Sequence, residues 1–141
     1  MATLRGDWVK RSFNGGLSAV FLLLPALALA HHGSVSSYNV AKLVTAEGKV
    51  TEFRWRNPHV WIFFDVRDAK GNVVNWGAET HSPATCRDQD GWSKSTLQPG
   101  DRITISIFPA NNGTPRGLLA RIVFKGRVIL DDVPRDRPGA R

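Results

Sequence analysis

The sequence predicts a mainly β domain, a small five-stranded barrel of the OB type with one short helix between its third and fourth strands. Five runs alternate apolar and polar residues with the period of two that strands require. A helix-capping pattern lies between the third run and the fourth. The resulting order of strands and helix is that of an OB-fold. A small β-sandwich, the alternative, would explain the strands but would leave the helix without a role.

We expect the chain to divide into four segments. Residues 1–30 are expected to form a signal peptide, residues 31–43 an extended lead, residues 44–130 the barrel, and residues 131–141 a disordered tail. The tail is expected because its sequence, "DDVPRDRPGAR", is charged, rich in proline and poor in apolar residues.

The first segment has the features of a secretory signal. Arg5, Lys10 and Arg11 precede an apolar run from Leu17 to Ala28, which is too short to span a membrane. The small-x-small pattern that ends at Ala30 marks a cleavage site. The sequence therefore predicts a periplasmic or secreted protein without a stable membrane span, whose mature chain begins "HHG".

The first strand is expected over residues 45–56. Its inward apolar residues share one parity up to Val50, whereas Phe53 and Trp55 have the other parity. A bulge near Thr51 would keep all of these large side chains inside the barrel.

The second and third strands follow from two alternating runs, at residues 60–66 and 74–78. The segment "DAKGN" between them suits a hairpin loop in which Gly71 has a left-handed conformation. In the resulting register the numbers of paired residues add up to 140, which places Trp61 opposite Glu79 and His59 opposite His81. A register shifted by two residues would pair His59 with Glu79 instead.

The remaining elements have equally local signals. Ser82, Pro83 and Gly91 suit the cap, first residue and end of a short helix. The fourth strand alternates from residue 103 to 107 after a Pro-Gly turn, the fifth is "LLARIVF" at 118–124, and "VIL" at 128–130 is a possible return strand. Trp92, just after the helix, could lie against the barrel.

Composition restricts the possible functions. The formal net charge of +7 is spread along the chain, which bears mainly on solubility. No nucleic-acid partner is expected, because such binding fits poorly with export. Cys86 is the only cysteine, so no internal disulfide forms, and we expect it to be buried as a small apolar residue. No nucleophile motif, phosphate-binding glycine loop or spaced carboxylate pair is present, so no enzyme activity is expected.

The histidines suggest a metal site. A mature N-terminal His31 would offer both its amine and its imidazole to one ion, and His32, His59 or His81 could add further nitrogen ligands. Such a set suits copper, whereas a tetrahedral set that includes Glu79 suits zinc. The same residues could also form only a structural polar cluster.

The alternative is a ligand surface without metal. Trp61 and Phe63 are expected on the outer face of the second and third strands, where OB-folds often bind ligands. They would suit an adaptor for a glycan or another envelope protein.

Several motifs resemble those of the DUF6152 family of small exported bacterial proteins. They are "HHG" with Tyr38 after it, "GKVTEFRWRNPHVWIFFDV", "VNWGAE", "SP", "GW" and "LQPGDRITI". The resemblance implies export and a small β-barrel, but no function. The family pattern contains the equivalents of His31, His32, His59, Trp76 and Glu79. Because it lacks His81 and Cys86, it favours His31, His32 and His59, with Glu79, as the set to test.

Overall fold

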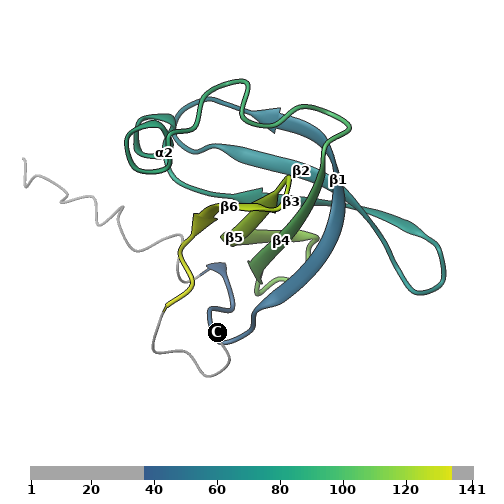
Figure 1. Cartoon of the computed structure of the whole chain (residues 1–141). Helices are drawn as coiled ribbons and strands as arrows, with labels where there is room; N and C mark the ends of the chain where they lie inside the picture. The colour runs from purple at the N-terminus through teal and green to yellow at the C-terminus, as the bar shows by residue number, and fades with distance from the viewer. Residues whose placement is uncertain (1–36, 135–141) are drawn as a thin grey trace, which may run out of the picture.

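The computed structural model describes residues 37–134 (Figure 1). The expected signal peptide, with His31 and His32, lies outside these described residues. The described elements are β1 (Val44–Arg54), β2 (Trp61–Arg67), β3 (Val73–Glu79), α2 (Pro83–Asp90), β4 (Arg102–Pro109), β5 (Arg116–Phe124) and β6 (Arg127–Asp131).

The strands form a closed barrel of the predicted type. Their order in the sheet is β3-β2-β1-β4-β5-β6, and a parallel pairing between β3 and β5 closes the ring of β1 to β5. The return strand β6 pairs with β5 outside that ring. The helix α2 connects β3 to β4, and Figure 1 shows it at one end of the barrel. The predicted OB-like fold class is therefore confirmed.

The predicted bulge in β1 is confirmed at the expected position. The register of β1 with β2 shifts between Val50 and Glu52, which leaves Thr51 as the extra residue. Val50, before the bulge, is buried in the core, and Phe53, after it, also packs against the core. The bulge thus lets both parts of one strand contribute apolar side chains to the same interior.

The hairpin of β2 and β3 has the predicted register. Trp61 pairs with Glu79, and Phe63 pairs with Gly77. At the loop, the Asp68 N–H donates to the Asn72 carbonyl at 2.8 Å, and Gly71 has a left-handed φ of 85°. This register decides which side chains lie on the outer face near the candidate site.

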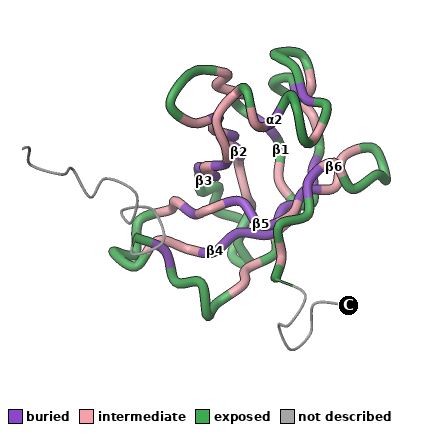
Figure 2. The backbone as a smooth tube through the Cα atoms, turned by 90° about the vertical axis from the view of Figure 1, so that its left-hand side faces the viewer, coloured by how far each residue is buried: buried purple, intermediate pink, exposed green. Residues whose placement is uncertain are grey.

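The core fills the barrel and continues under the helix. Figure 2 shows buried positions along β2, β4, β5 and β6. As expected, the Ser82 side chain accepts a hydrogen bond from the Thr85 N–H, and Cys86 on the inner side of α2 is buried. Trp92 is also buried, and its indole N–H donates to the Ile129 carbonyl at 2.8 Å. The helix and Trp92 together cover one end of the barrel.

Within residues 37–134, no helix is both long and apolar enough to cross a membrane.

Candidate functional site

Three side chains from distant parts of the chain form a hydrogen-bonded cluster at the ends of β2 and β3. Glu79, the last residue of β3, contacts His59 Nδ1 through Oε1. The hydroxyl of Tyr38, which precedes β1, donates to the other carboxylate oxygen, Oε2, at 2.5 Å. One carboxylate therefore fixes both the imidazole and the phenol, and we call this set the His59 cluster.

The hairpin register explains how His59 reaches Glu79. Glu79 lies opposite Trp61, and His59 is two residues before Trp61 on the same face. Such diagonal neighbours are within reach of long side chains. The contact considered for a shifted register therefore forms without any shift.

The structure does not bring the rings of His59 and His81 together, as the four-histidine version of the metal hypothesis expects, because each ring binds a different carboxylate. Their backbones lie side by side, because the N–H of Val60, next to His59, donates to the His81 carbonyl at 2.9 Å. The ring of His81, however, binds a different carboxylate, Asp132, through Nε2 at 2.8 Å. The part of the chain that the structure describes contains no group of three His, Cys, Asp or Glu side chains able to hold a metal ion.

The three side chains of the His59 cluster differ in how far they are buried. The Glu79 side chain is only 15% exposed, whereas that of His59 is 39% exposed. Tyr38 is buried, and its burial, followed by the hydrogen bond to Glu79, raises the pKa of its hydroxyl. Tyr38 thus remains a hydrogen-bond donor at neutral pH. His59 uses Nδ1 internally and has Nε2 as its second ring nitrogen.

Tyr38 had no assigned place in the predicted site. It is the only tyrosine in the sequence, but its partner Glu79 lies 41 residues away, so no local pattern indicates the contact. A backbone bridge to Ala110 also fixes its position. Tyr38 therefore connects the end of the N-terminal lead to the His59 cluster.

The aromatic residues of the alternative ligand face lie together. The rings of Trp61 and Phe63 stack with centroids 5.9 Å apart and planes 14° apart. The guanidinium carbons of Arg54 and Arg116 lie 4.4 Å and 5.4 Å from the Phe63 centroid. Phe63 and Arg116 also cover Gly77, where a Cβ atom would lie within about 3 Å of both side chains. The two arginines are members of this face that the sequence did not indicate.

Two carboxylates, those of Asp90 and Asp132, lie near His81. Burial, and then the charge of Asp132, raise the pKa of Asp90, whereas His81 lowers it. Burial, followed by the charges of Asp90 and Asp132, raises the pKa of the Cys86 thiol to about 11. The expected burial of Cys86 is confirmed, and this thiol is protonated at neutral pH.

Comparison with known proteins identifies a family but no activity. No curated protein matches the sequence. Among solved structures, the chain is similar to the mitochondrial single-stranded DNA binding protein Rim1 from S. cerevisiae. The two share 9% identity, the match covers 60% of this chain and 92% of that one, and the TM-score is 0.45. The model of a family of unknown function, DUF6152, matches residues 20–120. Because that match covers most of the sequence, the chain belongs to the DUF6152 family.

Proposed function

We propose that this protein is an exported binding protein without enzymatic activity that holds a transition-metal ion, copper in preference to zinc, at His59. The observation that carries the proposal is that the Glu79 carboxylate binds the Tyr38 hydroxyl through one oxygen and His59 Nδ1 through the other. In metal sites, a ligand histidine commonly binds a carboxylate through one ring nitrogen and the metal through the other. The His59 cluster has this arrangement, with Nε2 as the nitrogen for the metal.

The N-terminal histidines supply the other ligands of the proposed site. Seven residues can span at most about 23–25 Å, which is the distance available between His31 and Tyr38. Since Tyr38 already contacts Glu79, the length of the chain allows His31 and His32 to reach His59. Cleavage after Ala30 would add the amine of His31 as a further nitrogen ligand.

The role of Glu79 favours copper. A zinc site would need Glu79 as a direct ligand, but both carboxylate oxygens already bind Tyr38 and His59. The remaining donors are nitrogen atoms, which suit Cu(II).

The proposal is tested on the protein as it is secreted. Mass spectrometry should show His31 as the first residue, and copper titration followed by electron paramagnetic resonance should show a site with nitrogen ligands. His59→Ala should abolish this site, and Glu79→Gln should weaken copper binding by about 10–100-fold, the usual cost of losing such a carboxylate. His81→Ala is the matched control and should leave binding unchanged. Micromolar or tighter binding that survives both His31→Ala and His59→Ala would refute the site.

The stacked rings of Trp61 and Phe63 support a second candidate function, an adaptor that binds a glycan or an envelope protein. Copurification of a partner from the envelope tests this function. Loss of the partner in Trp61→Ala, together with indifference to chelators and to His59→Ala, would favour the adaptor over the metal site.

A further inference from the structure

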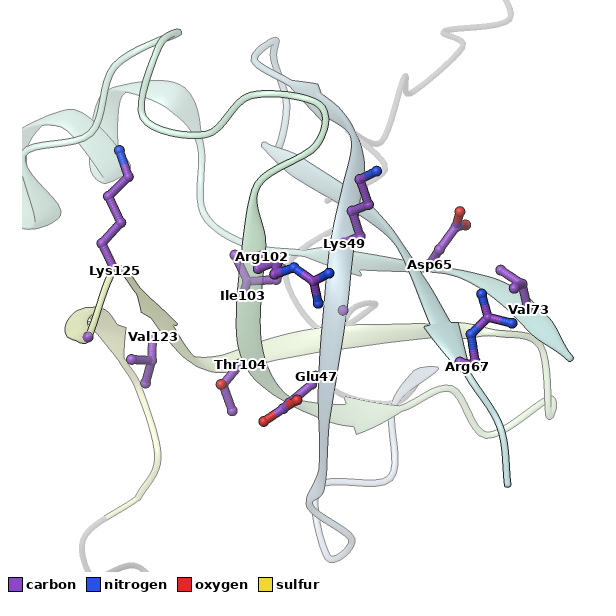
Figure 3. A pocket seen from close by; sticks show the side chains of 12 residues that line it. Glu47, Lys49, Asp65, Arg67, Val73, Arg102, Ile103, Thr104, Val123 and Lys125 are labelled. Carbon is purple, nitrogen blue, oxygen red and sulfur yellow. The ribbon is translucent and has the colours of Figure 1, made fainter. Parts of the chain in front are cut away.

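A groove of about 740 Å³ lies on the outer surface of the barrel, away from the His59 cluster. Its charged lining consists of Glu47, Lys49, Asp65, Arg67, Arg102 and Lys125. Figure 3 shows these side chains on β1, β2 and β4 and at the end of β5. We call this surface the basic groove.

Two cations of the basic groove, Lys49 and Arg102, lie directly opposite each other on neighbouring strands. Lys49 on β1 pairs directly with Arg102 on β4, and both side chains are exposed. Figure 3 shows the Arg102 side chain extending toward β1, between Lys49 and Glu47. Like charges directly opposite each other in a sheet are destabilising. An anion between Lys49 and Arg102 would remove that repulsion.

The nearby carboxylates do not neutralise these cations. Among the ion pairs of the described residues, none involves Lys49, Arg67, Arg102 or Lys125. Asp65 instead accepts a hydrogen bond from the Asn75 side chain at 2.8 Å. Arg67 donates to the Gly71 carbonyl at 2.9 Å, and the Lys125 ammonium lies 4.8 Å from the Phe124 ring centroid. The basic groove thus offers positive charge that no described carboxylate pairs, beside separate carboxylate acceptors.

This mixture of charges favours one class of ligand. A nucleic acid would bring its phosphates near Glu47 and Asp65, and the lining contains no aromatic ring on which bases could stack. A sugar with phosphate groups fits both kinds of side chain, because its hydroxyls donate to carboxylates while its phosphates accept from arginine and lysine. We propose that the basic groove binds a phosphorylated saccharide.

The experiment is calorimetric titration of the full chain with four probes. They are a bisphosphorylated disaccharide, the same disaccharide without phosphates, inorganic phosphate, and an oligothymidylate of equal charge. The bisphosphorylated disaccharide should bind at least about tenfold more tightly than each of the others, because only it engages both cations and carboxylates. Equal or tighter binding of the neutral sugar or the oligothymidylate, or no binding of any probe at millimolar concentration, would overturn the proposal.

Substitutions locate the binding in the groove. The double variant Lys49→Gln/Arg102→Gln should bind the bisphosphorylated disaccharide at least about tenfold more weakly, since it loses two charge-assisted contacts. The matched control is Arg87→Gln/Lys94→Gln, which removes the same charge from exposed positions outside the groove and should bind as the unaltered protein does. An equal loss of affinity in both double variants would show a non-specific effect of net charge and reject the groove.

The variant Glu47→Gln tests whether the groove recognises the sugar hydroxyls or only the phosphate groups of the ligand. If Glu47 accepts a sugar hydroxyl, this substitution should weaken binding of the bisphosphorylated disaccharide severalfold. If only phosphate is recognised, removal of the negative charge should strengthen binding, and that result would contradict the saccharide. All variants change exposed residues, and a ¹H–¹⁵N spectrum confirms that each retains the fold.

Discussion

His59 and His81 lie on neighbouring backbone segments just outside the paired ends of β2 and β3, yet they form two different histidine–carboxylate pairs. The partner of His59 is Glu79, which is 15% exposed and also bound by the buried Tyr38. The partner of His81 is Asp132, which is 45% exposed and lies beyond the end of β6. The imidazoles are about equally exposed, at 39% and 42%. The difference therefore lies in the carboxylates, and a largely buried carboxylate with a second partner can orient an imidazole better than an exposed one.

The largest difference between the two pairs should appear when each carboxylate is removed. Glu79→Ala should lower the free energy of unfolding by about 2–3 kcal/mol, because it leaves the Tyr38 hydroxyl buried without its acceptor. Asp132→Ala should lower it by less than about 1 kcal/mol, as is usual for an exposed ion pair. Urea unfolding of both variants measures the difference, and equal losses would contradict the comparison.

The reactivity of the Cys86 thiol depends on its burial and on the negative charge near His81. Its Sγ contacts the His81 carbonyl at 3.8 Å, and its pKa of about 11 is raised mainly by burial and then by Asp90 and Asp132. At pH 8, iodoacetamide should therefore alkylate the folded protein at least about 100-fold more slowly than the urea-unfolded chain. The rate in the folded state should still be rising at about pH 11, where the thiol is half ionised, and should level off only above that pH. Rapid alkylation of the folded protein at pH 8 would show that this region opens readily.

Much of the fold was predictable because its signals are local. The parity change after Val50 indicates the bulge at Thr51, and Gly71 in a short loop indicates the register of β2 and β3. Each of these features depends on side chains a few residues apart. The short-range alternation of apolar residues therefore predicted the strands and their order along the chain, and that order indicated the OB-like barrel.

The second partner of Glu79 and the partner of His81 were less predictable, because they depend on tertiary contacts. Tyr38 and Glu79 are 41 residues apart, and His81 and Asp132 are 51 residues apart. Asp132 belongs to the segment expected to be a tail, yet its N–H donates to the Ala120 carbonyl at 2.7 Å. The parallel pairing of β3 with β5, which places Arg116 near Phe63, is also a long-range contact. The sequence thus indicated His59 and Glu79 as candidates but not the residues that orient them.

Removal of the Tyr38 hydroxyl alone should have an intermediate effect. Tyr38→Phe retains the buried ring but leaves Glu79 with one partner fewer, so we expect a loss of about 1–2 kcal/mol in the free energy of unfolding. The double-mutant cycle with Glu79→Gln measures the coupling between these two side chains. The same cycle between Tyr38→Phe and Asp132→Asn is the control and should show no coupling. Additive effects of Tyr38→Phe and Glu79→Gln would show that the hydrogen bond contributes little to stability.

The smallest effect should come from Asp90, the second carboxylate near His81. Burial and Asp132 raise its pKa in the folded state, so the folded protein binds this proton more tightly than the unfolded chain does. Stability is therefore lost as pH rises from the unfolded pKa of about 3.9 through the folded pKa, and it remains lost at neutral pH. Asp90→Asn removes the titration and should stabilise the protein at pH 7 by no more than about 0.5 kcal/mol, since the site is partly open to solvent. The gain should disappear below about pH 3.5, where the unaltered protein and the Asp90→Asn variant both carry a neutral side chain at position 90. Thermal unfolding at the two pH values measures it, and a gain that persists at low pH would assign the effect to packing and not to charge.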